Sequence, residues 1–152
     1  MKINIFKFAA ASLFNFAITN GIIAVLVVIV LSNINRAQSQ VEESMMETDV
    51  ANIRWELREL WAHRNATGQS IAASEIDDAN PLKLVSERPK NYSGEYAEIP
   101  LGAESVWYFD TNAKRLVYVF KDGRQVRYRL IGSAKLNRAS LGAIGGIDLV
   151  LE

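Results

Sequence analysis

Few residues in this chain have the types and spacing that catalysis requires. There is one histidine, His63, and no cysteine, so disulfides, thiolate metal sites and cysteine nucleophiles are excluded. His63 lacks a second histidine or a serine and acid partner, and we interpret it as a solvated residue at a helix end. Asp77 and Asp78 form a carboxylate pair with no base or nucleophile beside them, typical of a solvated loop. We therefore expect no enzymatic activity, cofactor or metal.

Aromatic and basic residues are densest at residues 106–130, "VWYFDTNAKRLVYVFKDGRQVRYRL". The basic side chains are Lys114, Arg115, Lys121, Arg124, Arg127 and Arg129. In isolation such a ribbon would suit an acidic ligand, with aromatic rings available to stack on bases. The formal net charge of the chain is zero, so no global positive charge points to a polyanion.

The same stretch predicts an antiparallel β meander of three strands, at residues 106–110, 115–120 and 124–130. Pairing Asp110 with Arg115 across the first turn places Trp107 opposite Tyr118. The second turn has two possible registers: a two-residue Asp-Gly turn, or a three-residue Lys-Asp-Gly loop with a left-handed Gly123. We prefer the three-residue loop because it gathers the apolar residues on one face.

The preferred register predicts an apolar face that could pack on a helix, which makes the fold α+β. Its residues are Trp107, Phe109, Leu116, Tyr118, Phe120, Val126, Tyr128 and Leu130. We interpret these aromatics as core, and expect no nucleic-acid partner. The basic side chains take the other face and the turns, and Arg124, Arg127 and Arg129 are candidate partner contacts.

Residues 36–81 are acidic by contrast, with four Lys/Arg against nine Asp/Glu. Three interpretations remain open: charge segregation within one domain, complementary surfaces of neighbouring subunits, or a solvated sheet face.

Residues 32–66 predict an amphipathic stem helix that covers the sheet of its own domain. Its apolar stripe consists of Met46, Val50, Ile53, Leu57 and Leu60, with Trp61 beside it. Trp55 lies roughly opposite the stripe, and is either an unusually exposed aromatic or a partner contact. The helix either continues from the preceding segment or restarts near Ser39, and it is expected to end around residues 65–68.

An uncharged run at residues 8–31, "FAAASLFNFAITNGIIAVLVVIVL", predicts a transmembrane helix. Its 24 residues could reach roughly 36 Å against a hydrocarbon core of about 30 Å. The run is too long for a cleaved signal peptide. Lys2 and Lys7 precede the span and Arg36 follows it, which places residues 1–7 in the cytoplasm and the rest of the chain outside.

Ser12, Asn15 and Thr19 share one face of the predicted span, as residues in helix–helix contact in lipid do. The alternative is that Asn15 merely lies near the headgroups. Oligomerisation through this helix or through the stem is possible.

Residues 67–152 are expected to complete one exported domain with the stem helix. Residues 66–88 are polar and small and are expected to form a loop with a short apolar patch at residues 82–85. Residues 147–151 could form a final strand, reached through a flexible link at Gly142, Gly145 and Gly146.

This order of elements, an apolar helix running into an amphipathic stem, a loop and an antiparallel sheet, resembles the architecture of type IV pilins and pseudopilins. The block "WYFDTNAKRLVYVFKDG" is similar to a strand–turn–strand of minor pilins. More narrowly, "LVSERPKNYSGEYAEIP" followed by "WYFDTNAKRLVYVF" resembles accessory biogenesis proteins of MSHA-type (mannose-sensitive haemagglutinin) pili. The resemblance covers about residues 80–130 and implies pilins or pilus assembly proteins as partners.

The amino-terminal region departs from the prepilin pattern, in which a leader ends in glycine and glutamate is the fifth residue after it. The only internal candidate is Gly21, and the fifth residue after it is Leu26. We therefore expect an uncleaved protein that is not a bulk pilus subunit.

The sequence predicts a non-enzymatic, single-pass protein of the bacterial inner membrane that assists pilus assembly through a periplasmic domain. The alternative is a membrane-anchored binding or sensory module that uses the basic face of the meander for an acidic ligand.

Overall fold

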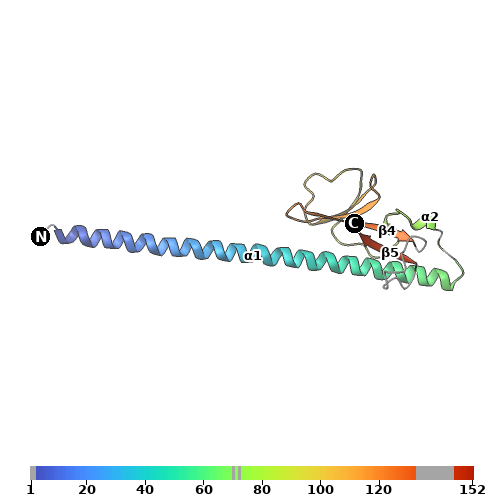
Figure 1. Ribbon diagram of the computed structural model, residues 1–152, viewed down its shortest axis with the longest axis horizontal. Coiled ribbons are helices and arrows are strands. Elements are labelled where there is room, and N and C mark those ends of the chain that lie inside the picture. The colour runs from blue at the N-terminus through green and yellow to red at the C-terminus, as the bar shows by residue number, and fades with distance from the viewer. Residues whose placement is uncertain (1–2, 70, 72, 133–145) are drawn as a thin grey trace. The chain divides into compact units, whose positions relative to one another are not determined.

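The computed structural model describes residues 3–69, 71, 73–132 and 146–152, with side chains from Phe14 onward except at residues 73–74. Two helices, one 3-10 helix and five strands follow one another in these residues (Figure 1). The chain divides into two units, residues 1–41 and residues 42–152, and each is described by itself.

Helix α1, Ile3–Ala66, continues without interruption from the apolar segment into the stem, so the predicted alternative of a restart near Ser39 is wrong. In its first part, the described side chains of residues 14–31 carry no charge and all are exposed. Among the described residues it is the one helix long and apolar enough to cross a membrane.

The second part of α1 belongs to the domain and buries one face, as the stripe predicts. Met46, Val50, Ile53 and Leu57 are buried, and Leu60 at the end of the stripe is half-buried. The helix ends at Ala66, where Gly68 adopts a positive φ of 74° and Gln69 N–H donates to the carbonyl of Arg64 at 2.9 Å. This end lies in the predicted region.

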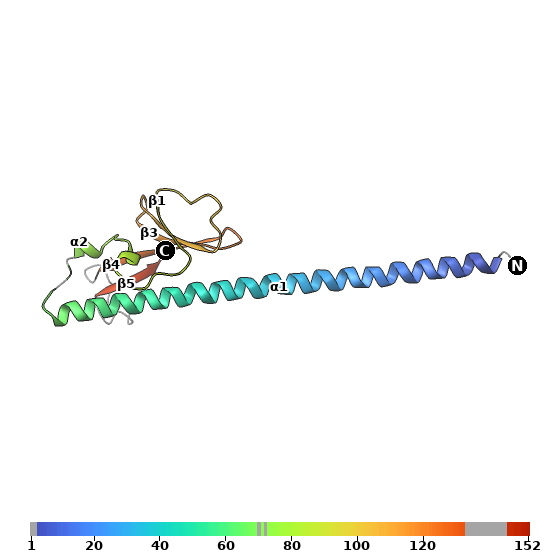
Figure 2. The same ribbon diagram turned by 180° about the vertical axis from the view of Figure 1, so that it is seen from behind.

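The sheet has five strands in the order β1-β2-β3-β4-β5 (Figures 1 and 2). They are β1 Tyr92–Tyr96, β2 Val106–Asp110, β3 Arg115–Val119, β4 Gln125–Gly132 and β5 Ile147–Leu151. The meander has the preferred register: Trp107 pairs with Tyr118, and Tyr118 pairs with Val126. Gly123 has a φ of 83°, the left-handed conformation that the three-residue loop requires. The final strand is present as expected.

The predicted meander of β2, β3 and β4 is antiparallel as expected, but the sheet as a whole is mixed, so the expectation of an antiparallel sheet is wrong at β1. Strand β1, "YSGEY", pairs parallel to β2 with a register shift between Tyr92 and Glu95, where Gly94 has a φ of 125°. It is short, carries a glycine and is mostly exposed, and it contains no aliphatic residue, so its sequence did not mark it as a strand.

The apolar face of the meander packs on the stripe of α1, as predicted. Trp107, Phe109, Leu116, Tyr118, Phe120, Tyr128 and Leu130 share one core cluster with Met46, Val50, Ile53 and Leu57, and Val126 packs against it.

The segment expected to be a polar loop contributes to this core. It contains helix α2, Ala73–Ile76, and the 3-10 helix η1, Pro81–Lys83, and it buries Ile76, Leu82 and Val85. Two glycines of the predicted flexible link, Gly142 and Gly145, lie outside the described residues. The third, Gly146, is described. Gly146 has a positive φ of 54°, and a Cβ there would overlap the indole ring of Trp61, so this position favours glycine.

The opposite face of the sheet, which we call the outer face, is partly covered too. Tyr108, Val117 and Val119 are buried there and pack with Ala103 from the segment 97–105 that joins β1 to β2. The outer face is therefore not simply a solvated surface.

Candidate partner-contact surfaces

Three carboxylates of α1 bind the helix to the rest of the domain. Glu42, Asp49 and Glu56 are spaced seven residues apart, so they line one flank of the buried stripe. Glu42 accepts hydrogen bonds from the hydroxyl of Ser105 at 2.7 Å and from the backbone N–H of Lys121 at 3.0 Å. Much of the acidic character of the stem thus serves contacts within one domain.

The other two carboxylates, Asp49 and Glu56, also accept hydrogen bonds from residues outside the helix. Asp49 accepts from the indole N–H of Trp107 at 2.9 Å, and Glu56 accepts from the hydroxyl of Ser86 at 2.6 Å and its N–H at 2.7 Å. Burial acts to raise the pKa of Glu56, but its hydrogen bonds from Ser86 and Glu87 outweigh it and hold the pKa below its usual value. We call the line of contacts made by Glu42, Asp49 and Glu56 the seam. Their seven-residue spacing beside the stripe is visible in the sequence, but the sequence interpretation missed it.

Tyr118 lies at the same seam and donates its hydroxyl to Glu42 at 3.2 Å. Burial, together with the negative charges of Glu42 and Asp49, raises the pKa of Tyr118 to about 12. The phenol therefore stays protonated and remains a hydrogen-bond donor at any physiological pH.

Both edges of the sheet carry features that disfavour pairing with another strand. At β5, the carbonyl of Leu149 accepts from Arg54 at 2.7 and 3.0 Å, and the N–H of Leu149 donates to Asp148 at 2.9 Å. Arg54 in turn forms an ion pair with Asp148 at 3.6 Å. At the opposite edge, β1 is short and carries the irregularity at Gly94. Short, bulged and charge-capped edges disfavour strand addition.

Asp77 and Asp78 are not a solvated loop, which corrects that interpretation. Asp77 accepts the backbone N–H of Gly132 at 2.9 Å, and the N–H of Asp78 donates to the carbonyl of Leu130 at 3.3 Å. The Asp78 carboxylate pairs with Arg129 at 2.8 Å and Arg115 at 3.5 Å. These contacts fasten the segment before η1 to strand β4.

The three candidate arginines differ in what they already contact. Arg129 is bound to Asp78, and this hydrogen bond raises its pKa. Arg124 pairs with Asp122 at 2.7 Å within its own turn and lies 4.5 Å from the ring centre of Phe120. Arg127 is exposed and contacts Gln125 at 3.2 Å, and it has no ion pair within the described residues. The basic set is therefore not one continuous unpaired patch.

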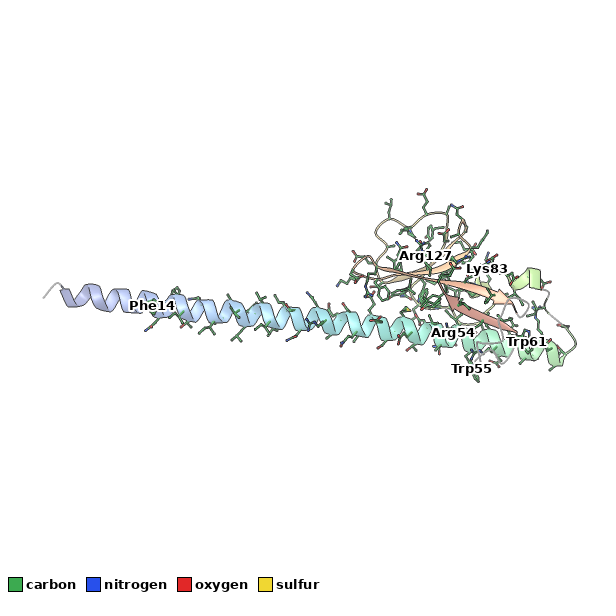
Figure 3. All side chains as sticks on the ribbon, in the orientation of Figure 1. Phe14, Arg54, Trp55, Trp61, Lys83 and Arg127 are labelled. Carbon is green, nitrogen blue, oxygen red and sulfur yellow. The ribbon has the colours of Figure 1, made fainter. Side chains whose placement is uncertain are left out.

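Trp55 is 69% exposed and lies on the side of α1 away from the sheet (Figure 3). This placement agrees with the position opposite the stripe that the sequence predicts. Trp55 belongs to neither core cluster of the described residues. It is the strongest of the predicted partner contacts on geometry.

The predicted contact face in the apolar segment is described only in part. Thr19 donates its hydroxyl to the carbonyl of Asn15 at 2.9 Å, so that hydroxyl is already satisfied within the helix. Asn15 is exposed, and the side chain of Ser12 lies outside the described residues.

No group of three or more histidine, cysteine or acidic side chains suited to a metal ion occurs in the described part of the chain. Comparison of the chain with protein-family models, with curated proteins and with solved structures gave no match.

Proposed function

We propose that this chain is a non-enzymatic, single-pass inner-membrane protein that assists assembly of a type IV, MSHA-like pilus through a periplasmic domain. The observation that supports this most is helix α1: its first part is apolar and exposed, and its second part packs on a sheet. That order of elements is the one that pilins share. The amino terminus then lies in the cytoplasm.

The expected partners are pilins or pilus assembly proteins, and the helix is the expected contact. Strand addition is disfavoured because Arg54 binds the edge carbonyl of Leu149 in β5, and β1 is short and irregular. Trp55 presents a large aromatic side chain that the described part of its own domain leaves 69% exposed. Exposed tryptophans of this kind often contribute strongly to protein interfaces.

The test is a deletion strain scored for pili and adhesion, complemented with wild type, Trp55→Ala or Trp55→Phe. We expect the deletion to lose pili, wild type and Trp55→Phe to restore them, and Trp55→Ala to restore them poorly. Circular dichroism of the purified variants checks that both are folded. Normal piliation in the deletion strain would overturn the proposed function, whereas full rescue by Trp55→Ala would reject only Trp55 as the contact.

The second candidate function is binding of an acidic ligand by the basic face, and the exposed Arg127 favours it. Arg127→Glu is the informative variant, because Arg124 and Arg129 already have carboxylate partners whereas Arg127 has no ion pair among the described residues. Binding of a model polyanion such as heparin at low salt should be lost in Arg127→Glu and kept in Lys90→Glu, an exposed control. Equal binding by all three proteins would dismiss this function.

A further inference from the structure

The outer face of the sheet is stepped. Val117 of β3 is fully buried, whereas Arg127, directly opposite it on β4, is exposed. Val119 is likewise buried beside a half-exposed Gln125. Segment 97–105, which packs Ala103 on Val117 and Val119, thus covers part of β2 and β3 and leaves Arg127 of β4 exposed, whereas Arg129 farther along β4 is bound by Asp78. We call this segment the ridge, and the exposed or half-exposed set Gln125, Arg127 and Val150 the ledge.

The ridge, "AEIPLGAES", combines apolar and acidic side chains. Leu101 is fully exposed and Ile99 is 48% exposed, although both are large and apolar. Glu98 and Glu104 flank them and are exposed, and the segment contains no basic residue. An apolar tip between two carboxylates is suited to a surface that is apolar and basic, and it is repelled by anionic lipid.

Hydrogen bonds hold both ends of the ridge and one turn within it. The Asn112 side chain donates to the carbonyl of Ala97 at 2.9 Å, and the Asn91 side chain donates to the carbonyl of Ser105 at 2.7 Å. Between these ends, Ala103 N–H donates to the carbonyl of Pro100 at 3.1 Å. The exposed apolar side chains are therefore presented by a segment that loses little conformational entropy on binding.

The ledge has the complementary chemistry. Val150 pairs with Arg129 on the outer face and is half-exposed. Arg127 supplies a positive charge that has no ion pair within the described residues. The nearby Glu152 carboxylate is bound to Arg115 instead.

We propose that the outer face is a self-association surface on which a second copy of this chain docks, with the ridge of each copy lying on the ledge of the other. A ridge beside a ledge on one face is self-complementary under a two-fold axis that runs along the step, as an isologous dimer requires. The axis brings Leu101 and Ile99 onto Val150, and Glu98 and Glu104 toward Arg127. This surface does not depend on the proposed role in pilus assembly.

Charge reversal tests the complementarity on the full chain in detergent micelles, with self-association measured by analytical ultracentrifugation. We expect Arg127→Glu alone, and Glu98→Lys with Glu104→Lys, each to weaken the dimer about tenfold, which corresponds to about 1.4 kcal/mol. Mixing the two variants should restore pairing between them. The control Glu59→Lys, exposed on α1, should dimerise like wild type. A monomeric wild type, or equal weakening by the control, would overturn the proposal.

Cross-linking tests the geometry of docking. Because the chain has no native cysteine, only the introduced cysteines can react. A flexible bis-maleimide should join Leu101→Cys to Arg127→Cys when the two variants are mixed. Trp55→Cys mixed with Arg127→Cys should give at least about tenfold less product, because Trp55 lies on the side of α1 away from the sheet. Equal yields for the two mixtures, or no product from the first, would contradict ridge-on-ledge docking.

Discussion

The two parts of helix α1 share one backbone conformation and have opposite chemistry. Between Phe14 and Leu31 the helix exposes large apolar side chains on every face. From Glu42 onward it buries one stripe, and its carboxylates accept hydrogen bonds from the domain. An uncharged, largely apolar helix surface is suited to a lipid-like environment, whereas an amphipathic one is satisfied by protein. Helical conformation is thus common to both parts, and side-chain chemistry sets their environments.

A cavity in the packed part should produce the largest effect on stability. Leu57 is fully buried in the core, so Leu57→Ala is expected to lower the free energy of unfolding by about 2–5 kcal/mol. Urea unfolding in detergent, followed by tryptophan fluorescence, measures this loss. Leu26→Ala, in the exposed part, is the matched control and should leave the transition unchanged. An equal loss of unfolding free energy in both variants would contradict the distinction between a packed and an exposed part of α1.

A charge in the apolar part should act on membrane insertion instead. Leu26→Arg is expected to cost on the order of 3 kcal/mol in insertion, because a cation at the centre of a span is poorly solvated. The measurement is the fraction of chain that resists carbonate extraction from membranes. Met45→Arg, exposed in the second part, should remain as membrane-bound as wild type. Full retention of Leu26→Arg would argue against the membrane span.

Removal of a seam carboxylate should have an intermediate effect. Asp49→Ala leaves the indole N–H of the buried Trp107 without its partner, which is expected to cost about 1–3 kcal/mol of stability. Glu43→Ala removes an exposed carboxylate from the same helix and should change stability by less than about 0.5 kcal/mol. Thermal unfolding of the two variants compares them directly.

The smallest effect is a pH dependence at Glu56. Because its pKa in the folded chain lies below the ordinary value of 4.5, its stabilising contribution is complete above that pH and is lost as pH falls through the folded pKa. Glu56→Gln should therefore be less stable than wild type at pH 7, and the difference should shrink below pH 4.5. A difference in stability that stays constant from pH 7 to the acid range would contradict this assignment.

The meander was predictable because its signals are local. Turn residues and the requirement for one apolar face set the pairing of Trp107 with Tyr118 and of Tyr118 with Val126, and the structure has that register. The stripe of α1 was predictable for the same reason, since helical periodicity alone selects Met46, Val50, Ile53 and Leu57.

Other contacts were not predictable, because they join segments far apart in the chain. Strand β1 is short, contains no aliphatic residue and is defined by its parallel pairing with β2. The sequence predicted a solvated Asp78, because its partners Arg115 and Arg129 lie far along the chain. Of the three arginines with the same local sequence signal, tertiary contacts occupy Arg129 and leave Arg127 exposed.

By itself, the sequence determined the apolar segment, the amphipathic stem and the register of the hairpins, because each depends on residue periodicity and local turn geometry. The tertiary structure alone decided which charged groups are partnered and which surfaces stay uncovered. A side chain's exposure depends on what packs over it, and the ridge that covers Val117 while Arg127 stays open comes from a segment with no periodic signal of its own.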